Sequence, residues 1–405
     1  MDGYRFLNQL KLKNFLSYGS EEATVDLEPL NVIIGPNASG KSNLLEALSL
    51  FKALPNDLGV PIRQGGGVDE WLWKGAEATP TAELEAVVDY PDGVMPLRYK
   101  LQFTMAGQRL ELTDEAVESE HPSNEHQDDV YFFYRFQQGR PVINVRSVPE
   151  TQPGTDRGRQ QRMLKREDLK PDQSVLSQRK DPDLYPELTF VGTRFSEIHL
   201  YREWNLGRHT APRMPQKTDL PGDFLLEDGS NLGLVINNLQ NVLGSQVLVD
   251  QLKVFYEDVE EISTRILGGT VQLFLRERGL RQPIPATRLS DGTLRYLCLL
   301  TILCHPSPPP LVCIEEPELG LHPDILPTVA KLLIAASQRT QLIVTTHSET
   351  LVSELSDIPE AVMVCERTPN GTHLQRLSPE RLEKWLEKYS LGELWSMGEI
   401  GATRW

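Results

Sequence analysis

Short apolar runs separated by polar breaks dominate the first third of the chain. Residues 7–15 and 23–27 alternate apolar and polar side chains, which predicts two β-strands, and an apolar, β-branched run at 31–34 predicts a third. A helical pattern covers 43–53 and begins directly after a loop that contains two glycines. We expect the first two strands to pack beside the third, which leads into that loop.

A second group of strands follows this helix. Three alternating segments between residues 83 and 113 predict an antiparallel layer, because turn residues separate them. Eight acidic residues and no Lys or Arg lie between 111 and 129, a composition typical of a solvated loop, so we expect a domain boundary there. Another strand pair is predicted at 131–136 and 142–145.

The middle of the chain is irregular and then helical. Pro, Gly and charged residues fill 206–223, which predicts a long connector. Apolar spacing predicts a helix at 231–252 and a second helix at 254–266, before a strand at 271–276. The patterns together predict a discontinuous domain formed by 1–113 and 286–370, an insertion at 114–285 that is partly helical, and a tail at 371–405 that packs on the discontinuous domain.

The last third shows one arrangement twice, a short buried strand followed at once by polar residues. The strand predicted at 311–314 precedes the run E-E-P-E, and the strand at 341–345 precedes T-H-S. Polar residues at the carboxyl ends of parallel strands gather at one edge of a sheet. We expect the 311–314 strand to lie beside the strand that enters the glycine loop. Ser290 is the predicted N-cap of a helix that runs through Ile302.

The glycine loop spells G-x-x-x-x-G-K-S between a strand and a helix, which is the context that a P-loop requires. Glycines let successive backbone N–H groups turn inward, and the helix N-terminus adds attraction for phosphate. Lys41 is expected to reach the β- and γ-phosphates, and the Ser42 hydroxyl to hold Mg²⁺. The residues predicted to bind the nucleotide here are Gly35, Pro36, Asn37, Ala38, Ser39, Gly40, Lys41, Ser42 and Asn43.

The acids after the 311–314 strand supply what an NTPase needs next, a metal ligand and a base for water. Glu315 is the candidate metal ligand, directly or through a water molecule, and Glu316 is the candidate general base. His347 is the candidate sensor of the γ-phosphate. The alternative is that the acids form a solvated loop and that His347 is structural. Two adjacent acids at the end of a buried strand favour the functional interpretation.

Composition narrows the choice of partners. The chain has 405 residues and a net charge of −16, which argues against general coating of nucleic acid. Local DNA contact is most plausible between Arg157 and Lys180, where eight basic residues stand against three acidic ones; a solvated face or a loop paired with the acidic tract is the alternative. The sequence predicts no membrane span and no signal peptide, so we expect a cytoplasmic protein.

Four motifs in this order resemble the ABC-type ATPases of the RecF, SMC and OLD class, often described as AAA family ATPases. They are the P-loop, L-S-D-G-T at 289–293, I-E-E-P-E-L-G-L-H-P at 314–323 and T-T-H-S at 345–348. The resemblance implies an α/β fold, a P-loop NTPase head of ABC/SMC type with a mixed parallel core sheet and an antiparallel layer. A large α+β insertion would interrupt that head.

The same resemblance implies a composite active site. Two copies of the chain would form a homodimer around two ATP molecules, with Mg²⁺, and Ser290 and Gly292 of one copy would reach the γ-phosphate bound by the other. It assigns Gln64 to the metal ion or the attacking water. Catalysis would rest on Lys41, on Glu316 as the activator of water, and on the switch residue His347.

Glu315 stands where this class more often has Asp, which implies water-mediated metal contact and slow turnover. OLD proteins carry a nuclease domain after the head, but only 58 residues follow His347 here, so any nuclease is expected to be a separately encoded effector. We predict an ATPase that dimerises on ATP and serves as a sensor or scaffold, on DNA or for an effector, in genome maintenance, DNA repair or phage defence. The alternative is a non-hydrolysing, ATP-gated binding or assembly protein.

Overall fold

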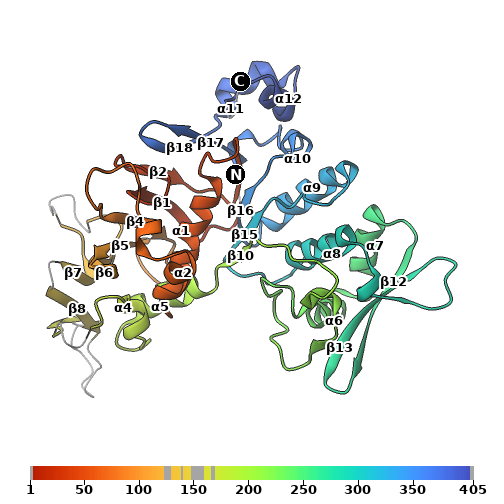
Figure 1. Cartoon of the computed structure of the whole chain (residues 1–405), viewed down its shortest axis with the longest axis horizontal. Coiled ribbons are helices and arrows are strands. Elements are labelled where there is room, and N and C mark those ends of the chain that lie inside the picture. The colour runs from red at the N-terminus through yellow and green to blue at the C-terminus, as the bar shows by residue number, and fades with distance from the viewer. Residues whose placement is uncertain (1–2, 123–128, 138–139, 147–158, 166–168, 402–405) are drawn as a thin grey trace.

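The computed structural model describes residues 3–122, 129–137, 140–146, 159–165 and 169–401 (Figure 1). Its central sheet contains, in spatial order, β10 (His199–Tyr201), β15 (Leu311–Glu315), β16 (Gln341–Thr345), β3 (Leu30–Ile34), β17 (Val362–Thr368) and β18 (Gly371–Arg376). The first five strands run parallel and β18 runs antiparallel. Their carboxyl ends therefore meet at one edge, where the P-loop begins.

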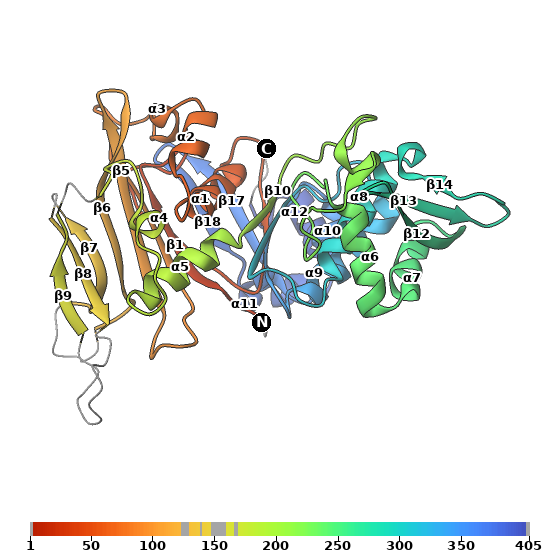
Figure 2. The same ribbon diagram turned by 90° about the horizontal axis from the view of Figure 1, so that it is seen from below.

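An antiparallel sheet of eight strands lies at one end of the molecule, and a smaller sheet lies at the other end (Figure 2). The larger sheet has the order β2 (Ala23–Asp26), β1 (Leu7–Lys13), β4 (Ala82–Val88), β5 (Leu97–Ala106), β6 (Arg109–Ser119), β7 (Phe132–Gln137), β8 (Arg140–Arg146) and β9 (Arg159–Met163). The smaller sheet contains β11 (Gln216–Lys217), β12 (Val259–Leu267), β13 (Thr270–Glu277) and β14 (Ile284–Pro285).

Helices cover both faces of the central sheet. Between this sheet and the antiparallel one lie α1 (Lys41–Ala53) and α5 (Pro186–Ser196), whose Phe51 and Phe195 rings pack with Tyr99 of β5. The remaining helices are α2 (Gly59–Gln64), α3 (Val68–Trp71), α4 (Val175–Gln178), α6 (Leu232–Leu243), α7 (Ser245–Phe255), α8 (Asp291–Leu303), α9 (Leu326–Ala336), α10 (Glu349–Ser353), α11 (Pro379–Leu386) and α12 (Leu391–Ser396).

The burial of β3 follows from this layering. All five of its residues are buried, as expected for a parallel strand covered on both faces. Ile33 belongs to the core that contains α1 and the antiparallel sheet, whereas Val32 and Ile34 belong to the core on the opposite face. The predicted α/β architecture, a largely parallel core sheet with a separate antiparallel layer, is confirmed.

Two expectations about strand neighbours are wrong. The 311–314 strand does not lie beside the P-loop strand, because β16 pairs with both and separates β15 from β3. The two N-terminal strands, β1 and β2, belong to the antiparallel sheet, where β1 pairs with β2 and β4. The predicted helix at 254–266 is also wrong: α6 and α7 divide the preceding helical region, and the segment after them forms β12.

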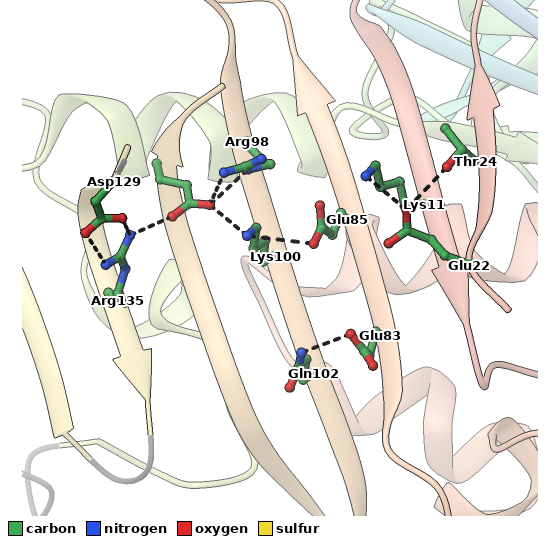
Figure 3. A network of polar contacts seen from close by, with 11 residues as sticks. Lys11, Glu22, Thr24, Glu83, Glu85, Arg98, Lys100, Gln102, Asp129 and Arg135 are labelled. Carbon is green, nitrogen blue, oxygen red and sulfur yellow. Dashed lines mark hydrogen bonds and ion pairs between the residues drawn. The ribbon is translucent and has the colours of Figure 1, made fainter. Parts of the chain in front are cut away.

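The first part of the acidic segment, predicted to be a loop, belongs to strand β6. This strand continues without a break past residue 113, where the domain boundary was expected, and ends at Ser119. Glu118 on this strand is buried, and its carboxylate lies 2.7 Å from Arg98, 3.0 Å from Lys100 and 3.1 Å from Arg135. Figure 3 shows these cations on neighbouring strands, with Arg135 also bound to Asp129. A buried carboxylate requires such partners. Charge pairing across strands therefore explains the burial of Glu118, an acid that composition alone predicts to be exposed to solvent.

Candidate nucleotide-binding site

The P-loop joins the end of β3 to the start of α1 and depends on its two glycines. Gly35 has a φ of 155°, and a Cβ atom there would lie 2.3 Å from the Cys365 carbonyl oxygen. Gly40 has a φ of 114°, and a Cβ atom there would lie 2.2 Å from Thr372 Oγ1. Any other residue would collide with β17 or β18 at these positions. The backbone can therefore curl tightly at the N-terminus of α1, where N–H groups attract phosphate.

Lys41 is the first residue of α1 and lies across this loop. Its ammonium group donates hydrogen bonds to the carbonyl oxygens of Gly35, at 2.7 Å, and Pro36, at 3.1 Å. The side chain is buried, and this burial lowers the pKa of the ammonium group. Asn37 and Ala38 at the tip of the loop are exposed. The lysine is thus held beside the space that the loop encloses.

Ser42 and Glu315 meet at the carboxyl edge of the central sheet. The Ser42 hydroxyl, on the first turn of α1, donates a hydrogen bond to Oε1 of Glu315, the last residue of β15. A hydroxyl and a carboxylate are the hard oxygen ligands that Mg²⁺ prefers. In the described residues no group of three His, Cys, Asp or Glu side chains is arranged to hold a metal ion. The pair fits a cation that takes its other ligands from phosphate and water.

Glu316, His347 and Glu318 cluster beside this pair. Glu316 has a φ of 48°, a strained conformation for a residue with a side chain, and its N–H donates to the Thr345 carbonyl of β16 at 2.9 Å. His347 Nε2 lies 3.6 Å from Glu316 Oε1. Burial first, and the charge of Lys41 second, lower the pKa of His347. The candidate base and the candidate sensor are therefore neighbours, next to the candidate phosphate ligand.

Glu318 is a member of this cluster that the sequence did not single out. Its Oε1 accepts hydrogen bonds from the Thr346 hydroxyl at 2.8 Å and from the His347 N–H at 2.7 Å. Glu318 thereby ties the backbone at His347 to the loop that follows β15. The available signal was the third acid of the run E-E-P-E, because a polar group at the end of a buried strand needs a hydrogen-bond partner.

The residues 289–293, which we call the signature loop, stand apart from this cluster. Ser290 caps α8 by accepting a hydrogen bond from the Thr293 N–H at 3.0 Å, as predicted, and it is exposed together with Asp291. Among the described residues, none of the hydrogen bonds of Ser290 reaches the P-loop. A Cβ atom on Gly292 would lie 2.7 Å from the Gly320 carbonyl, so the loop packs closely on the turn after β15.

Arg213 holds the signature loop from behind. Its buried guanidinium donates to the Leu289 carbonyl, to the Ala286 carbonyl at 3.3 Å and to the Leu206 carbonyl at 2.7 Å, and it pairs with Asp291. The sequence pattern did not reveal this residue, because it lies in the irregular connector 206–223 and makes its contacts far along the chain.

Arg202 and Trp204, which precede that connector, contact the candidate metal ligand. Arg202 Nε lies 3.2 Å from Glu315 Oε2, and the Trp204 indole donates to the Glu315 carbonyl at 3.1 Å. Arg295 of α8 stacks its guanidinium 5.0 Å from the centre of the Trp204 ring and donates to the Glu316 carbonyl at 3.3 Å. Polar residues directly after the short apolar run 198–201 were the signal for this contact, in the same arrangement that marks 311–316.

Gln64, at the end of α2, lies on the rim of the same region. It lines a cavity of about 1020 Å³ together with Glu315, Arg202, Glu46 and His209. The structure therefore brings the glutamine to a water-accessible space beside the candidate metal ligand.

Comparison with known proteins gives matches over most of the chain and over short segments. A family model described as "AAA domain, putative AbiEii toxin, Type IV TA system" matches residues 30–353. The chromosome partition protein Smc of Mycolicibacterium paratuberculosis is 31% identical over 98 residues, which are 23% of this chain and 8% of that protein. The DNA replication and repair protein RecF of Oenococcus oeni is 50% identical over 46 residues, 11% of this chain and 12% of RecF. The chain thus matches only a small part of either relative.

Two crystal structures of Smc heads resemble the whole chain. One, bound to the C-winged helix domain of ScpA, has a TM-score of 0.58 at 14% identity and covers 93% of this chain and 99% of its own. The other, from Pyrococcus furiosus and bound to the C-terminal domain of ScpA, has a TM-score of 0.57 at 12% identity, with 95% and 99% covered. At such identities the likeness shows the fold. No helix in the described residues is long and apolar enough to cross a membrane.

Proposed function

Since the chain belongs to the AAA-domain family described as a putative AbiEii toxin of a type IV TA system, and is an ATP-binding protein of the ABC ATPase type, we propose that it hydrolyses ATP with Mg²⁺. The observation that carries this proposal is the contact between the Ser42 hydroxyl and Glu315, with Glu316 and His347 beside it. A metal ligand pair, a base and a polar sensor then share one sheet edge.

The chemistry follows from the placement of these groups. The N–H groups at the start of α1 and the Lys41 ammonium would bind the phosphates, and the Ser42 hydroxyl and Glu315 carboxylate, which already contact each other, would hold the metal ion. Bound Mg²⁺ would neutralise charge that develops on the phosphate oxygens. Glu316 accepts the proton of the attacking water at its carboxylate, and His347 orients toward the γ-phosphate. Gln64, from the cavity side, positions the same water or the metal ion.

The homodimer is the second part of the proposal. Ser290 and Asp291 are exposed, and their side chains bond to the start of α8 and to Arg213. An exposed N-terminus of α8 is suited to a phosphate that belongs to another molecule. We infer that Ser290 and Gly292 complete the nucleotide site of a second copy. Two copies would then enclose two ATP molecules between them, as the sequence motifs imply.

Partners of this dimer belong to the proposal as well. The solved Smc heads are bound to domains of ScpA, and the matched relatives act in chromosome partition and in DNA replication and repair. We propose a separately encoded effector for this chain, with a role in genome maintenance or phage defence. DNA contact through the window 157–180, where Arg162 and Lys165 are exposed, is tested by the salt dependence of binding after charge reversal of these two residues.

A non-hydrolysing, ATP-gated protein is the second candidate function. The observation that favours it is the Arg202 guanidinium beside Glu315 Oε2, because a cation next to the candidate ligand weakens its attraction for a metal ion. Phosphate release by the wild type, measured against Glu316→Ala as background, separates the two functions. Hydrolysis predicts a wild-type rate about 100-fold or more above the variant, the usual effect of a general base. Equal rates would leave ATP-gated binding as the function.

A further inference from the structure

Arg202 joins the two elements that carry the candidate metal ligands. Its Nη1 lies 2.7 Å from Glu46 Oε1, and its Nε lies 3.2 Å from Glu315 Oε2. Glu46 follows Ser42 by four residues on α1, so the two side chains share one side of that helix. Ser42 in turn donates to Glu315 Oε1. Ser42, Glu315, Arg202 and Glu46 thus form a chain of three polar contacts whose two ends both lie on α1, and we call these four residues the carboxylate ring.

Sheet register explains why Arg202 reaches this position. Tyr201, the last residue of β10, pairs with Ile314 of β15, so the residues that follow them, Arg202 and Glu315, are neighbours at the carboxyl edge of the sheet. The Trp204 indole then anchors the Glu315 carbonyl. The position of Arg202 in the chain is therefore fixed by strand pairing before it and by the Trp204 contact after it.

The carboxylate ring orients the Glu315 side chain and offsets part of its negative charge. With Oε2 held by Arg202, Oε1 points to Ser42, the second candidate metal ligand. Glu46 has its other oxygen within 3.3 Å of the Ser49 hydroxyl, so both carboxylates of the ring are fully engaged. One guanidinium offsets part of the charge of two carboxylates. Only a planar, multivalent donor can bridge them both in this way.

We propose that Arg202 is a positioning residue, which aims Glu315 Oε1 at the metal position and moderates the attraction of this acidic pair for the metal ion. This inference rests on the proposed ATPase function. Removal of the guanidinium has two opposite effects: the uncompensated carboxylates attract Mg²⁺ more strongly, while Glu315 loses its direction. Metal binding and turnover should therefore change in opposite senses, which a loss of folded protein cannot produce.

The test measures the Mg²⁺ dependence of nucleotide binding, separately from turnover. Binding of a fluorescent ATP analogue is titrated with Mg²⁺ in the Glu316→Gln background, so that hydrolysis does not consume the ligand. Arg202→Met should lower the half-saturating Mg²⁺ concentration by about threefold, the scale of a partly exposed ion pair. In the otherwise wild-type chain it should lower the rate of phosphate release about tenfold.

Two further variants separate charge from geometry. Arg202→Lys keeps the charge but cannot bridge both carboxylates, so its half-saturating Mg²⁺ concentration should stay within about twofold of the parent while its turnover remains reduced. Arg194→Met removes a partly exposed arginine of α5 that pairs with Glu197, away from Glu315, and it should change neither quantity.

The outcomes distinguish this inference from the function on which it rests. An unchanged or raised half-saturating Mg²⁺ concentration in Arg202→Met, beside a wild type that binds and hydrolyses ATP, overturns the role of Arg202 alone. A wild type that binds no nucleotide at saturating Mg²⁺ overturns the proposed function, and the inference with it. A lower half-saturating concentration together with slower turnover supports both.

Discussion

The P-loop and the signature loop are built in opposite ways. In the P-loop, Gly35, Gly40 and Lys41 are buried, and the backbone itself forms the enclosing wall. In the signature loop, Ser290 is exposed, and the side chain of Arg213 braces the backbone from behind. A buried wall of backbone suits a ligand held within one chain, whereas an exposed, braced loop suits contact with another molecule. This difference is the structural basis for a site shared between two copies.

The largest effect, on ATP affinity, should come from a change in the buried P-loop. Lys41→Ala removes the cation that lies across the P-loop, and charge-assisted hydrogen bonds to two phosphates are lost with it. We expect ATP affinity to fall roughly 100-fold or more, measured by calorimetry. Lys52→Ala on the same helix, where the lysine forms an exposed pair with Glu227, is the matched control and should bind ATP as the wild type does.

Arg213→Met sharpens the comparison by changing only the signature loop. The loss of a buried donor to three carbonyls should loosen residues 289–293 and raise the dissociation constant of an ATP-driven dimer about tenfold, since one unsatisfied buried group costs about 1–3 kcal/mol. ATP affinity of the single chain should stay within about threefold of the wild type. A loss of ATP affinity as large as that of Lys41→Ala would show that the two halves are not separate. Arg276→Met, which removes an exposed pair with Glu261, controls for charge.

The smallest effect, on stability alone, concerns Glu115, which lies outside both the P-loop and the signature loop. This carboxylate is buried on β6 and accepts hydrogen bonds from the Tyr99 hydroxyl at 2.6 Å and the Val175 N–H at 2.9 Å. Burial raises its pKa from the ordinary value of 4.5 to about 7. Between these values the unfolded chain has lost a proton that the folded chain keeps, so the free energy of unfolding should fall as pH rises through this window and level off above it.

Glu115→Gln removes the titration, so its melting temperature relative to that of the wild type should increase from pH 5 to pH 8. Thermal melts across this range measure the difference. ATP affinity and dimerisation should not change, which makes the variant a reference for effects confined to stability. A difference in melting temperature that is independent of pH would contradict the assignment.

Local sequence signals made the candidate site predictable. The order of the strands in the central sheet was not predictable, because it depends on long-range pairing. The P-loop, the strand 311–314 with its acids, and the cap at Ser290 depend on residues close in sequence. The position of β16 between β15 and β3 depends on strand pairing across hundreds of residues, which no local pattern encodes.

The second helix predicted at 254–266 failed for a related reason. Its apolar spacing fits a helix and a half-buried strand equally well, and pairing with β13 decides for the strand. Arg213 escaped notice because the irregular connector 206–223 shows no periodicity, and Arg202 because it follows a strand of only three residues; only the folded chain reveals that they reach the signature loop and Glu315.

The central claim, a site completed by a second copy, is tested most directly by the molar mass of Glu316→Gln in saturating Mg-ATP. Without its base the variant should bind ATP and remain closed, so light scattering should give twice the chain mass of 45.7 kDa, and 45.7 kDa once nucleotide is removed. Arg213→Met in the same background should return the mass toward that of one chain. A Glu316→Gln protein that binds Mg-ATP yet stays at 45.7 kDa would contradict the shared site.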